Sequence, residues 1–237
     1  LVDEAHNSGA DCIKFQMRDM ESLYGNTAHS EKENADLGTQ YTLELLNKFQ
    51  LSDQDLYTVF DYVKDIGSIP LCTPWDLPSL EKLEDYGMEA YKVASADFTN
   101  HELLQSISAK GKLMICSTGM ADENEIKEGI KYIKKLGCPF ALLHCNSTYP
   151  APFKDINLNY ISHLKNLSGG LVGYSGHERD INIPIAAIGL GAKIIEKHFT
   201  LDKSMEGNDH KVSLLPDEFK RMVTGIRQVE ESLGTTS

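Results

Sequence analysis

Two histidines stand at the ends of two neighbouring apolar stretches in the carboxyl-terminal half of the chain. His177 follows residues 171–175, and His198 closes residues 193–198. Both stretches have the composition of short buried strands, and the Ala- and Ile-rich residues 183–190 between them are typical of a helix packed on a sheet. Parallel strands joined by a helix end at the same edge of the sheet, where ligands bind. The pattern predicts that both imidazoles hold one divalent metal ion, with coordination positions left open.

The flanking residues favour this interpretation over the simpler one. A single histidine at a strand end is more often a hydrogen-bonded surface residue than a metal ligand. Glu196 and Lys197, however, place two charges beside His198 in an otherwise apolar strand, where ionisable groups are unfavourable unless they are paired or used. Residues 206–210 add a further polar loop that we expect at the same edge.

Two lysines lie inside predicted strands, Lys14 in residues 11–17 and Lys92 in residues 90–95. A buried ammonium group must find anionic partners or lose its proton, so these lysines indicate either an anion clamp or a Schiff-base lysine. Hydroxyl groups at neighbouring strand ends would add hydrogen bonds to an anion. The polar residues that we expect at this edge are Lys14, Gln16, Thr73, Lys92, Ser95, Asp97, Ser117, Thr118, Asn146, Ser147, Tyr149, Ser175, His177, Glu196 and His198.

Strands and helices alternate along the chain, which predicts a parallel sheet. About seven strands are expected, whereas a closed (β/α)8 TIM barrel has eight, so we expect a first strand to precede Leu1. An open doubly wound sheet is the alternative, but no Gly-x-Gly-x-x-Gly turn follows any predicted strand. The polar residues 18–41 predict a long loop that would serve as a lid. The predicted strands are residues 11–17, 69–74, 90–95, 112–116, 140–145, 171–175 and 193–198.

Composition narrows the class of partner. The 237 residues fit one large domain. A formal net charge of -12 argues against nucleic acid or an anionic membrane as the partner, so an anionic substrate would need a local cationic pocket. The five cysteines have no paired spacing and predict reduced thiols in a cytoplasmic protein. No apolar run approaches the roughly 18 residues of a membrane span.

Seven short motifs follow one another from residue 14 to residue 210. They are Lys-Phe-Gln at 14–16, Tyr-Lys-Val-Ala-Ser-Ala-Asp at 91–97, Ser-Thr-Gly-Met at 117–120, Leu-His-Cys-Asn-Ser-Thr-Tyr-Pro at 143–150, Gly-Tyr-Ser-Gly-His at 173–177, Glu-Lys-His-Phe-Thr at 196–200 and Gly-Asn-Asp-His at 207–210. As an ordered set they resemble the sialic acid synthase family, the N-acetylneuraminate synthases.

The resemblance implies a barrel enzyme that condenses phosphoenolpyruvate with an N-acetylated amino sugar, typically N-acetylmannosamine, to give a nine-carbon 2-keto acid and phosphate. It implies a divalent ion, Mn²⁺ or Mg²⁺, on His177 and His198. The implied catalytic residues are Lys92, Asp97, Tyr149, Glu196 and Asp209. With the strand-end residues Gln16 and Thr73 added, the substrate-binding residues are Lys14, Gln16, Thr73, Ser95, Ser117, Ser147 and Ser175.

The chain also departs from the family pattern. The glutamate and the Asn-His-Asn-Gly loop of the family's first strand are absent, as is the antifreeze-like carboxyl-terminal domain that caps the partner's barrel in a domain-swapped dimer. We therefore expect residues 1–237 to be a single TIM-barrel catalytic domain, and the full-length protein to be a homodimer. Asp97 stands where some members have glutamate, and Ser147 stands where others have asparagine.

Three alternatives remain open at this point. The acceptor could be a bacterial diamino sugar that leads to legionaminic or pseudaminic acid. The chain could be a non-catalytic barrel that binds phosphoenolpyruvate. It could also be a Schiff-base aldolase that uses Lys92 or Lys14.

Overall fold

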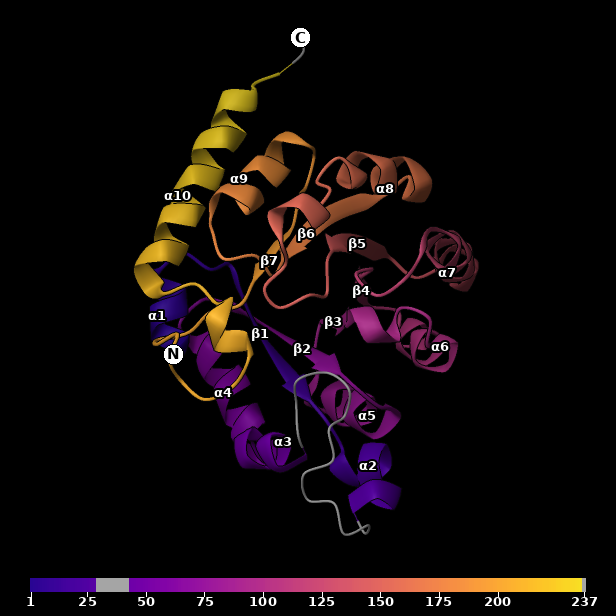
Figure 1. Ribbon diagram of the computed structural model, residues 1–237. Coiled ribbons are helices and arrows are strands. Elements are labelled where there is room, and N and C mark those ends of the chain that lie inside the picture. Colours follow the sequence, from indigo (N-terminus) through magenta and orange to yellow (C-terminus); the bar gives the residue numbers. More distant parts are fainter. Residues whose placement is uncertain (29–42, 236–237) are drawn as a thin grey trace.

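The computed structural model describes residues 1–28 and 43–235. Its strands are all parallel and pair in chain order, and they curve around a common axis with the helices outside (Figure 1). This arrangement confirms the predicted (β/α)8 class with seven of its strands in the described chain. The strands are β1 (Cys12–Met17), β2 (Ile69–Pro74), β3 (Ala90–Val93), β4 (Leu113–Ser117), β5 (Phe140–Cys145), β6 (Leu171–Gly176) and β7 (Ile195–Lys197).

The helices follow the expected alternation, with short 3-10 turns at three strand or loop ends. The α-helices are α1 (Val2–Asn7), α2 (Met20–Ala28), α3 (Leu43–Phe49), α4 (Asp53–Asp65), α5 (Leu77–Tyr86), α6 (His101–Ala109), α7 (Glu123–Leu136), α8 (Tyr160–Ser168), α9 (Asn182–Gly189) and α10 (Pro216–Leu233). The 3-10 turns are η1 (Ser95–Asp97), η2 (Phe153–Asp155) and η3 (Asp209–Lys211).

The prediction of a loop over residues 18–41 is wrong in its first part, because α2 lies there. The Asp19 carboxylate accepts a hydrogen bond from the backbone N–H of Ser22 at 3.0 Å, as a helix-capping residue does. Met20 and Leu23 stand at helical spacing, a signal that the polar composition of the segment obscures. The remainder of that prediction, including the lid, lies outside the described residues.

Local signals in the sequence set several of the helix ends. The Ser52 side chain accepts from the backbone N–H of Asp55 at 3.1 Å and caps α4. Asp122 and Glu125 form a reciprocal capping box at the start of α7. That helix ends at Gly137, whose φ of 80° favours glycine. These caps fix where each helix begins, and so fix the loops at the carboxyl ends of the strands.

The main apolar core lies between the sheet and the helices and includes Phe60, Tyr91, Leu142 and Tyr174, all at most 1% exposed. A second, smaller cluster joins α9 to α10 through residues such as Ile188 and Met222. It also contains Leu214, whose backbone N–H donates to the carbonyl of His198 at 2.8 Å. The last helix therefore supports the segment that follows β7.

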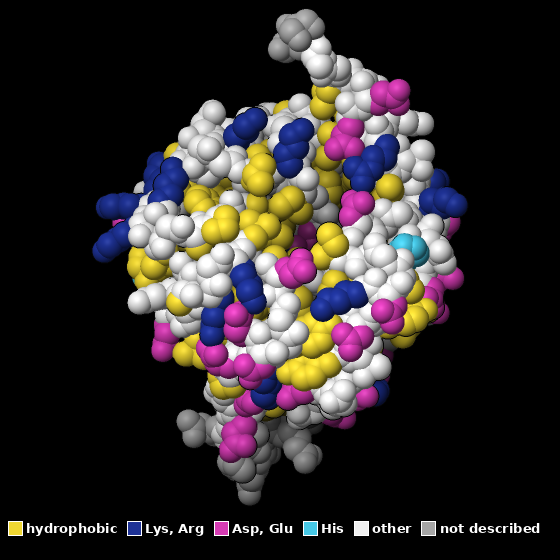
Figure 2. Space-filling view, turned by 180° about the vertical axis from the view of Figure 1, so that it is seen from behind, with side chains coloured by type: hydrophobic (Ala, Val, Ile, Leu, Met, Phe, Trp, Pro, Cys, Tyr) yellow, Lys and Arg dark blue, Asp and Glu magenta, His cyan; other side chains and the backbone are white. Residues whose placement is uncertain are grey.

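The outer surface carries charges of both signs. Figure 2 shows hydrophobic side chains gathered around a hollow on the side turned away from the viewer in Figure 1, with basic and acidic side chains interspersed around them. That face offers no continuous cationic surface for nucleic acid. Within residues 1–28 and 43–235, no helix combines the length and apolarity needed to cross a bilayer.

Strands β6 and β7 approach each other closely at Gly173. A Cβ atom added there would lie 2.3 Å from the backbone oxygen of Ile194 and 2.6 Å from a methyl carbon of Leu143. The absence of a side chain at Gly173 therefore sets how near the two histidine-bearing strands come.

We predict that Gly173→Ala lowers the free energy of unfolding by about 2 to 3 kcal/mol, because the backbone of β7 must move to admit the new methyl group. Urea unfolding would measure the change. Gly170→Ala is the matched control, since a Cβ at Gly170 would meet nothing within 4 Å. Equal stability of the two variants would contradict the close approach.

Candidate active site

One cavity of about 500 Å³ collects the predicted residues at the carboxyl ends of the strands. This volume lies within the usual range for a small-molecule site. Successive strands contribute side chains because parallel strands end at the same edge. The predicted residues that line the cavity are Lys14, Gln16, Thr73, Lys92, Ser95, Ser117, Ser147, Tyr149, Ser175, His177, Glu196, His198 and Asp209.

A cationic cluster occupies one wall of the cavity. The Lys92 ammonium group is buried and donates to Ser117 Oγ at 2.7 Å and to the Val93 carbonyl at 2.9 Å. Its Nζ also lies 3.6 Å from Glu196 Oε2, while Lys14 Nζ lies 3.8 Å from Glu196 Oε1. Three strands, β1, β3 and β7, thus meet through these side chains.

The protonation of this cluster follows from its surroundings. Burial lowers the pKa of Lys92, and the Glu196 carboxylate opposes that shift. Burial raises the pKa of Glu196, but the ammonium groups of Lys92 and Lys14 outweigh it and bring the pKa down to about 2. Glu196 is therefore ionised at neutral pH. Two lysines beside one carboxylate leave an excess of positive charge, which suits an anionic ligand.

The two histidines stand side by side in the same cavity. Their ring centroids are 5.3 Å apart, and the Tyr149 ring stacks on His177 with centroids 4.0 Å apart. His177 Nδ1 lies 2.7 Å from the carbonyl oxygen of Asn146, which only accepts, so we assign the ring proton to Nδ1. His177 Nε2 then accepts from the Tyr149 hydroxyl at 2.9 Å. His198 Nδ1 lies 3.6 Å from Asp209 Oδ2.

The chemistry of these donors fits a divalent metal ion. Burial, helped by His198, lowers the pKa of His177 to about 4, and burial also lowers the pKa of His198 against the effect of Asp209. Both rings are therefore neutral at pH 7, the form that coordinates metals. Across the described part of the chain, no cluster of three or more His, Cys, Asp or Glu side chains is arranged to hold a metal. The histidine pair would supply two ligands and leave positions for substrate and water.

Three residues that we expect at this edge, Asp97, Thr118 and Asn146, are not among those that line the cavity; Thr118 and Asn146 line a second cavity beside it. After β3 the chain turns into η1, and Asp97 Oδ1 accepts from the Asn100 side chain at 3.1 Å. Its Oδ2 atom is buried without a hydrogen-bond partner among the described residues, and burial raises its pKa. Asn100 caps α6, so Asp97 contacts the start of that helix. The catalytic role of Asp97 stays a prediction.

The cavity also contains residues that we did not predict, chiefly Arg18 and Trp75. The Arg18 guanidinium lies 4.3 Å from the centroid of the Trp75 ring. Both side chains donate to Gln16 Oε1, at 2.6 Å from Arg18 and 3.1 Å from Trp75. Each follows directly on a strand, β1 or β2, so their positions in the sequence carried the same signal as the residues that we did select. The remaining unpredicted lining residues are Tyr24, Leu46, Ala94, Ala96, Met120 and Cys145.

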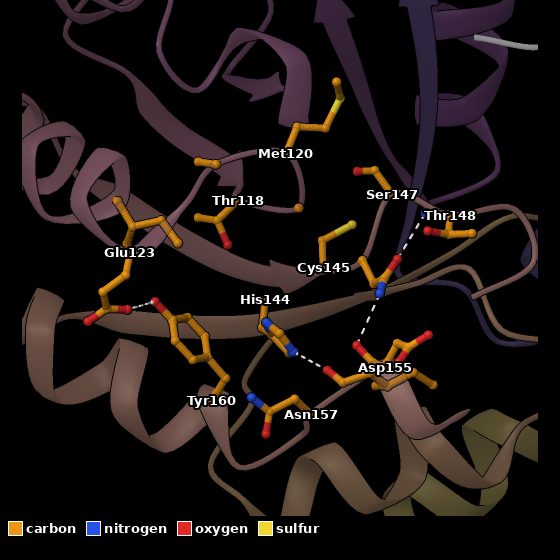
Figure 3. Close-up of a pocket in the computed structure, with 15 residues that line it drawn as sticks. Thr118, Met120, Glu123, His144, Cys145, Ser147, Thr148, Asp155, Asn157 and Tyr160 are labelled. Carbon is orange, nitrogen blue, oxygen red and sulfur yellow. Dashed lines mark hydrogen bonds between the residues drawn. The ribbon is translucent and has the colours of Figure 1, made fainter. Parts of the chain in front are cut away.

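A second cavity, of about 460 Å³, lies beside the first, and Met120, Cys145 and Ser147 line both. Figure 3 shows hydrogen bonds among several of its polar side chains: His144 contacts the Ile156 carbonyl at 2.6 Å, and Tyr160 donates to Glu123. His144 is thus a buried histidine whose ring is hydrogen-bonded within the protein. No lysine or arginine is among the residues of this second cavity. The first cavity is therefore the one suited to an anion.

Comparison with known proteins identifies the family. The model of the NeuB family matches residues 1–237. The chain belongs to the NeuB family. Membership in the NeuB family confirms, at the level of the family, the resemblance to the sialic acid synthases.

Two curated relatives and one solved structure are similar to this chain over nearly its whole length. An uncharacterized protein of Methanocaldococcus jannaschii is 43% identical over 99% of this chain and 66% of its own length. The N,N'-diacetyllegionaminic acid synthase of Campylobacter jejuni is 39% identical over 99% of this chain and 72% of its own. The chain thus spans about two thirds of the length of the first relative. The N-acetylneuraminic acid synthetase of Leptospira borgpetersenii, solved with citrate, superposes with a TM-score of 0.89 and 32% identity over 100% of this chain and 79% of that one.

We predict that the His177 ring of the metal-free protein stays neutral from pH 8 to about pH 5 and titrates near pH 4. The unfolded chain takes up this proton near pH 6.5, so the free energy of unfolding falls as the pH drops from about 6.5 to 4. Ring resonances in an NMR pH titration would report the protonation. A His177 ring that titrates near pH 6.5 would contradict the burial of this imidazole.

Proposed function

We propose that the chain is the catalytic barrel of a synthase that joins phosphoenolpyruvate to an N-acetylated amino sugar. The acceptor that we propose first is N-acetylmannosamine, with N-acetylneuraminate and phosphate as products. One observation carries the proposal: Lys14, Lys92 and Glu196 form a cationic cluster beside a pair of neutral histidines in a single cavity. Membership in the NeuB family supports it.

Phosphoenolpyruvate would bind through its negative charges. Lys14 and Lys92 would contact its phosphate and carboxylate, and the hydroxyls of Ser117 and Ser175 would add neutral hydrogen bonds. Lys92 is already directed by Ser117 and the Val93 carbonyl, so its ammonium group is held in place before substrate arrives. A preorganised cation of this kind adds more to binding and catalysis than a mobile surface lysine.

His177 and His198 would hold Mn²⁺ or Mg²⁺. When bound there, the metal would act as a Lewis acid on the aldehyde oxygen of the open-chain sugar. The Asn146 carbonyl accepts from His177 Nδ1–H and so fixes the orientation of this imidazole. His177 Nε2, which accepts from the Tyr149 hydroxyl, is the nitrogen that would bind the metal, so this hydrogen bond would be given up when the metal binds. At the second histidine, Asp209 Oδ2 lies 3.6 Å from His198 Nδ1.

The reaction would proceed by two bond-forming steps. The methylene carbon of phosphoenolpyruvate forms a C–C bond to the aldehyde carbon, which leaves positive charge on the second carbon of the enol. Water adds to that carbon, and one of its protons passes to the alkoxide formed from the aldehyde oxygen. The C–O bond to phosphate then breaks as the remaining O–H becomes the keto group, and its proton leaves with the phosphate. Glu196, with a pKa near 2, is a weak base but a permanent negative charge. We assign it to stabilise the cationic carbon rather than to remove a proton.

A second acceptor is supported by a specific observation. The Campylobacter jejuni relative at 39% identity is named for N,N'-diacetyllegionaminic acid, so a diacetylated amino sugar is the alternative acceptor. Both acceptors require the same cationic cluster and the same chemistry at phosphoenolpyruvate. The two acceptor sugars differ in the substituents that lie away from the aldehyde carbon.

The test measures phosphate release from phosphoenolpyruvate that carries ¹⁸O in the bridging C–O–P position. The sample is the full-length natural protein in which residues 1–237 occur. We expect release that requires both Mn²⁺ and a sugar acceptor, with the label in phosphate because the C–O bond breaks. Activity with N-acetylmannosamine selects the first acceptor, and activity with a diacetamido sugar alone selects the second. Borohydride trapping of a keto acid on Lys92 or Lys14, without a metal requirement, would instead indicate a Schiff-base aldolase. Binding without turnover of any acceptor would refute the enzymatic proposal.

We predict that Lys92→Met lowers kcat/KM for phosphoenolpyruvate by roughly 100-fold or more, because a buried, preorganised cation is lost. Lys131→Met is the matched control: that side chain is 78% exposed on α7 and should leave kcat/KM unchanged. Thermal unfolding would verify that both variants fold. Similar kinetics in the two variants would remove Lys92 from the site.

A further inference from the structure

We infer that a buried cluster of Tyr174, Gly176, Glu178 and Lys197 positions the two histidine-bearing strand ends, and thereby sets the affinity for the metal. The inference rests on the proposed metal site at His177 and His198. None of the four residues lines the cavity. They are positioning residues that act through the backbone of β6 and β7.

Strand alternation places this cluster behind the site. Ser175 and Glu196 pair in register and line the cavity. Successive side chains in a strand point to opposite faces, so the neighbouring pair, Gly176 and Lys197, faces the helices instead. Tyr174 belongs to the apolar core on that side. Each candidate metal ligand therefore has a member of the cluster as its neighbour in the chain.

The contacts within the cluster bridge the two strands. Lys197 Nζ donates to Glu178 Oε1 at 2.8 Å and also to the backbone carbonyl of Glu178. The Tyr174 hydroxyl donates to Glu178 Oε2 at 2.5 Å. The side chains of Lys197 and Glu178 are both 0% exposed. Lys197, which precedes His198, thus holds the backbone of the residue that follows His177.

Gly176 makes room for this arrangement. A Cβ atom there would lie 2.7 and 2.8 Å from the two carboxylate oxygens of Glu178 and 2.8 Å from a ring carbon of Tyr174. The carboxylate occupies the space that any other side chain would take. A side chain at position 176 would therefore displace the Glu178 carboxylate, so the glycine is what allows the buried acid to lie here.

Stability alone does not explain why the Glu178 and Lys197 ion pair is buried. Removing two charges from water offsets much of their attraction, and apolar residues of similar size often stabilise a core equally well. The best-attested use of a buried pair is to specify one arrangement of the chain among several. Here the arrangement that it specifies is the separation of the two histidine rings, whose centroids lie 5.3 Å apart.

The decisive variant is the double substitution Glu178→Gln with Lys197→Met. It removes both charges, so the net charge near the histidines is unchanged, and the new amide oxygen can still accept from the Tyr174 hydroxyl. We expect the Kd for Mn²⁺, measured by electron paramagnetic resonance on the protein without substrate, to rise about tenfold or more, as for supporting residues around other metal sites. Thermal unfolding and circular dichroism would establish that the variant is folded.

The chain offers a matched control of the same composition. Tyr91 donates to Glu84 Oε2 at 2.5 Å, and Lys112 Nζ lies 2.7 Å from the same oxygen. Glu84 and Lys112 do not line the cavity. Glu84→Gln with Lys112→Met should leave the Kd for Mn²⁺ unchanged, whatever it does to stability.

Each outcome then has one meaning. Weak or absent Mn²⁺ binding by the unaltered protein refutes the proposed metal site itself. An unaltered Kd in the folded Glu178 and Lys197 variant, or an equal loss in the Glu84 and Lys112 control, overturns the positioning role. If the double variant does not fold, Tyr174→Phe decides: a roughly threefold rise in Kd, as expected for one lost hydrogen bond, supports the inference, and no change overturns it.

Discussion

The site depends on the electrostatic balance of one carboxylate and two ammonium groups inside the barrel. Lys14 and Lys92 repel each other, and burial disfavours the charged form of Lys92. Glu196 lies 3.8 and 3.6 Å from their nitrogens and offsets the repulsion between them. The same lysines hold Glu196 ionised in a place where burial alone would favour the neutral acid. The cluster is therefore stable only as a unit, and its residual positive charge is what an anionic substrate can satisfy.

The strand ends carry two kinds of polar residue on their two faces. Inward-facing side chains such as Ser175 and Glu196 line the cavity, whereas Glu178 and Lys197 pair on the side of the helices. In residues 196–198, for example, Glu196 and His198 line the cavity, whereas Lys197 between them pairs with Glu178 on the opposite face. Residues with the same chemical type in the same motif need not share a role.

Much of the site could be predicted from the sequence, because the order of the strands and the two-residue alternation of their side chains can be recognised there. Lys14 and Gln16 were expected in the cavity, and Phe15 between them packs on Phe60 with ring centroids 5.6 Å apart. The contact of Arg18 with Trp75 was missed because it depends on the register of β1 with β2, which composition does not reveal.

Asp97 is a position that the sequence pattern does not resolve: it belongs to the single turn of 3-10 helix after β3 and is not among the residues that line the cavity. The sequence pattern therefore predicts which residues lie near the strand ends. The distances between them and the local turns are known only from the folded structure.

The pairing order of the sheet gives the Lys14 and Glu196 contact a further meaning. Among the described strands, β1 and β7 each have a single neighbour, so they are the two outermost strands of the curved sheet. Lys14 on β1 and Glu196 on β7 join these edges across the interior rather than through backbone pairing. A ligand that contacts both side chains therefore bridges the two outermost described strands. By mass action its binding free energy would add to the stability of the sheet at both edges at once.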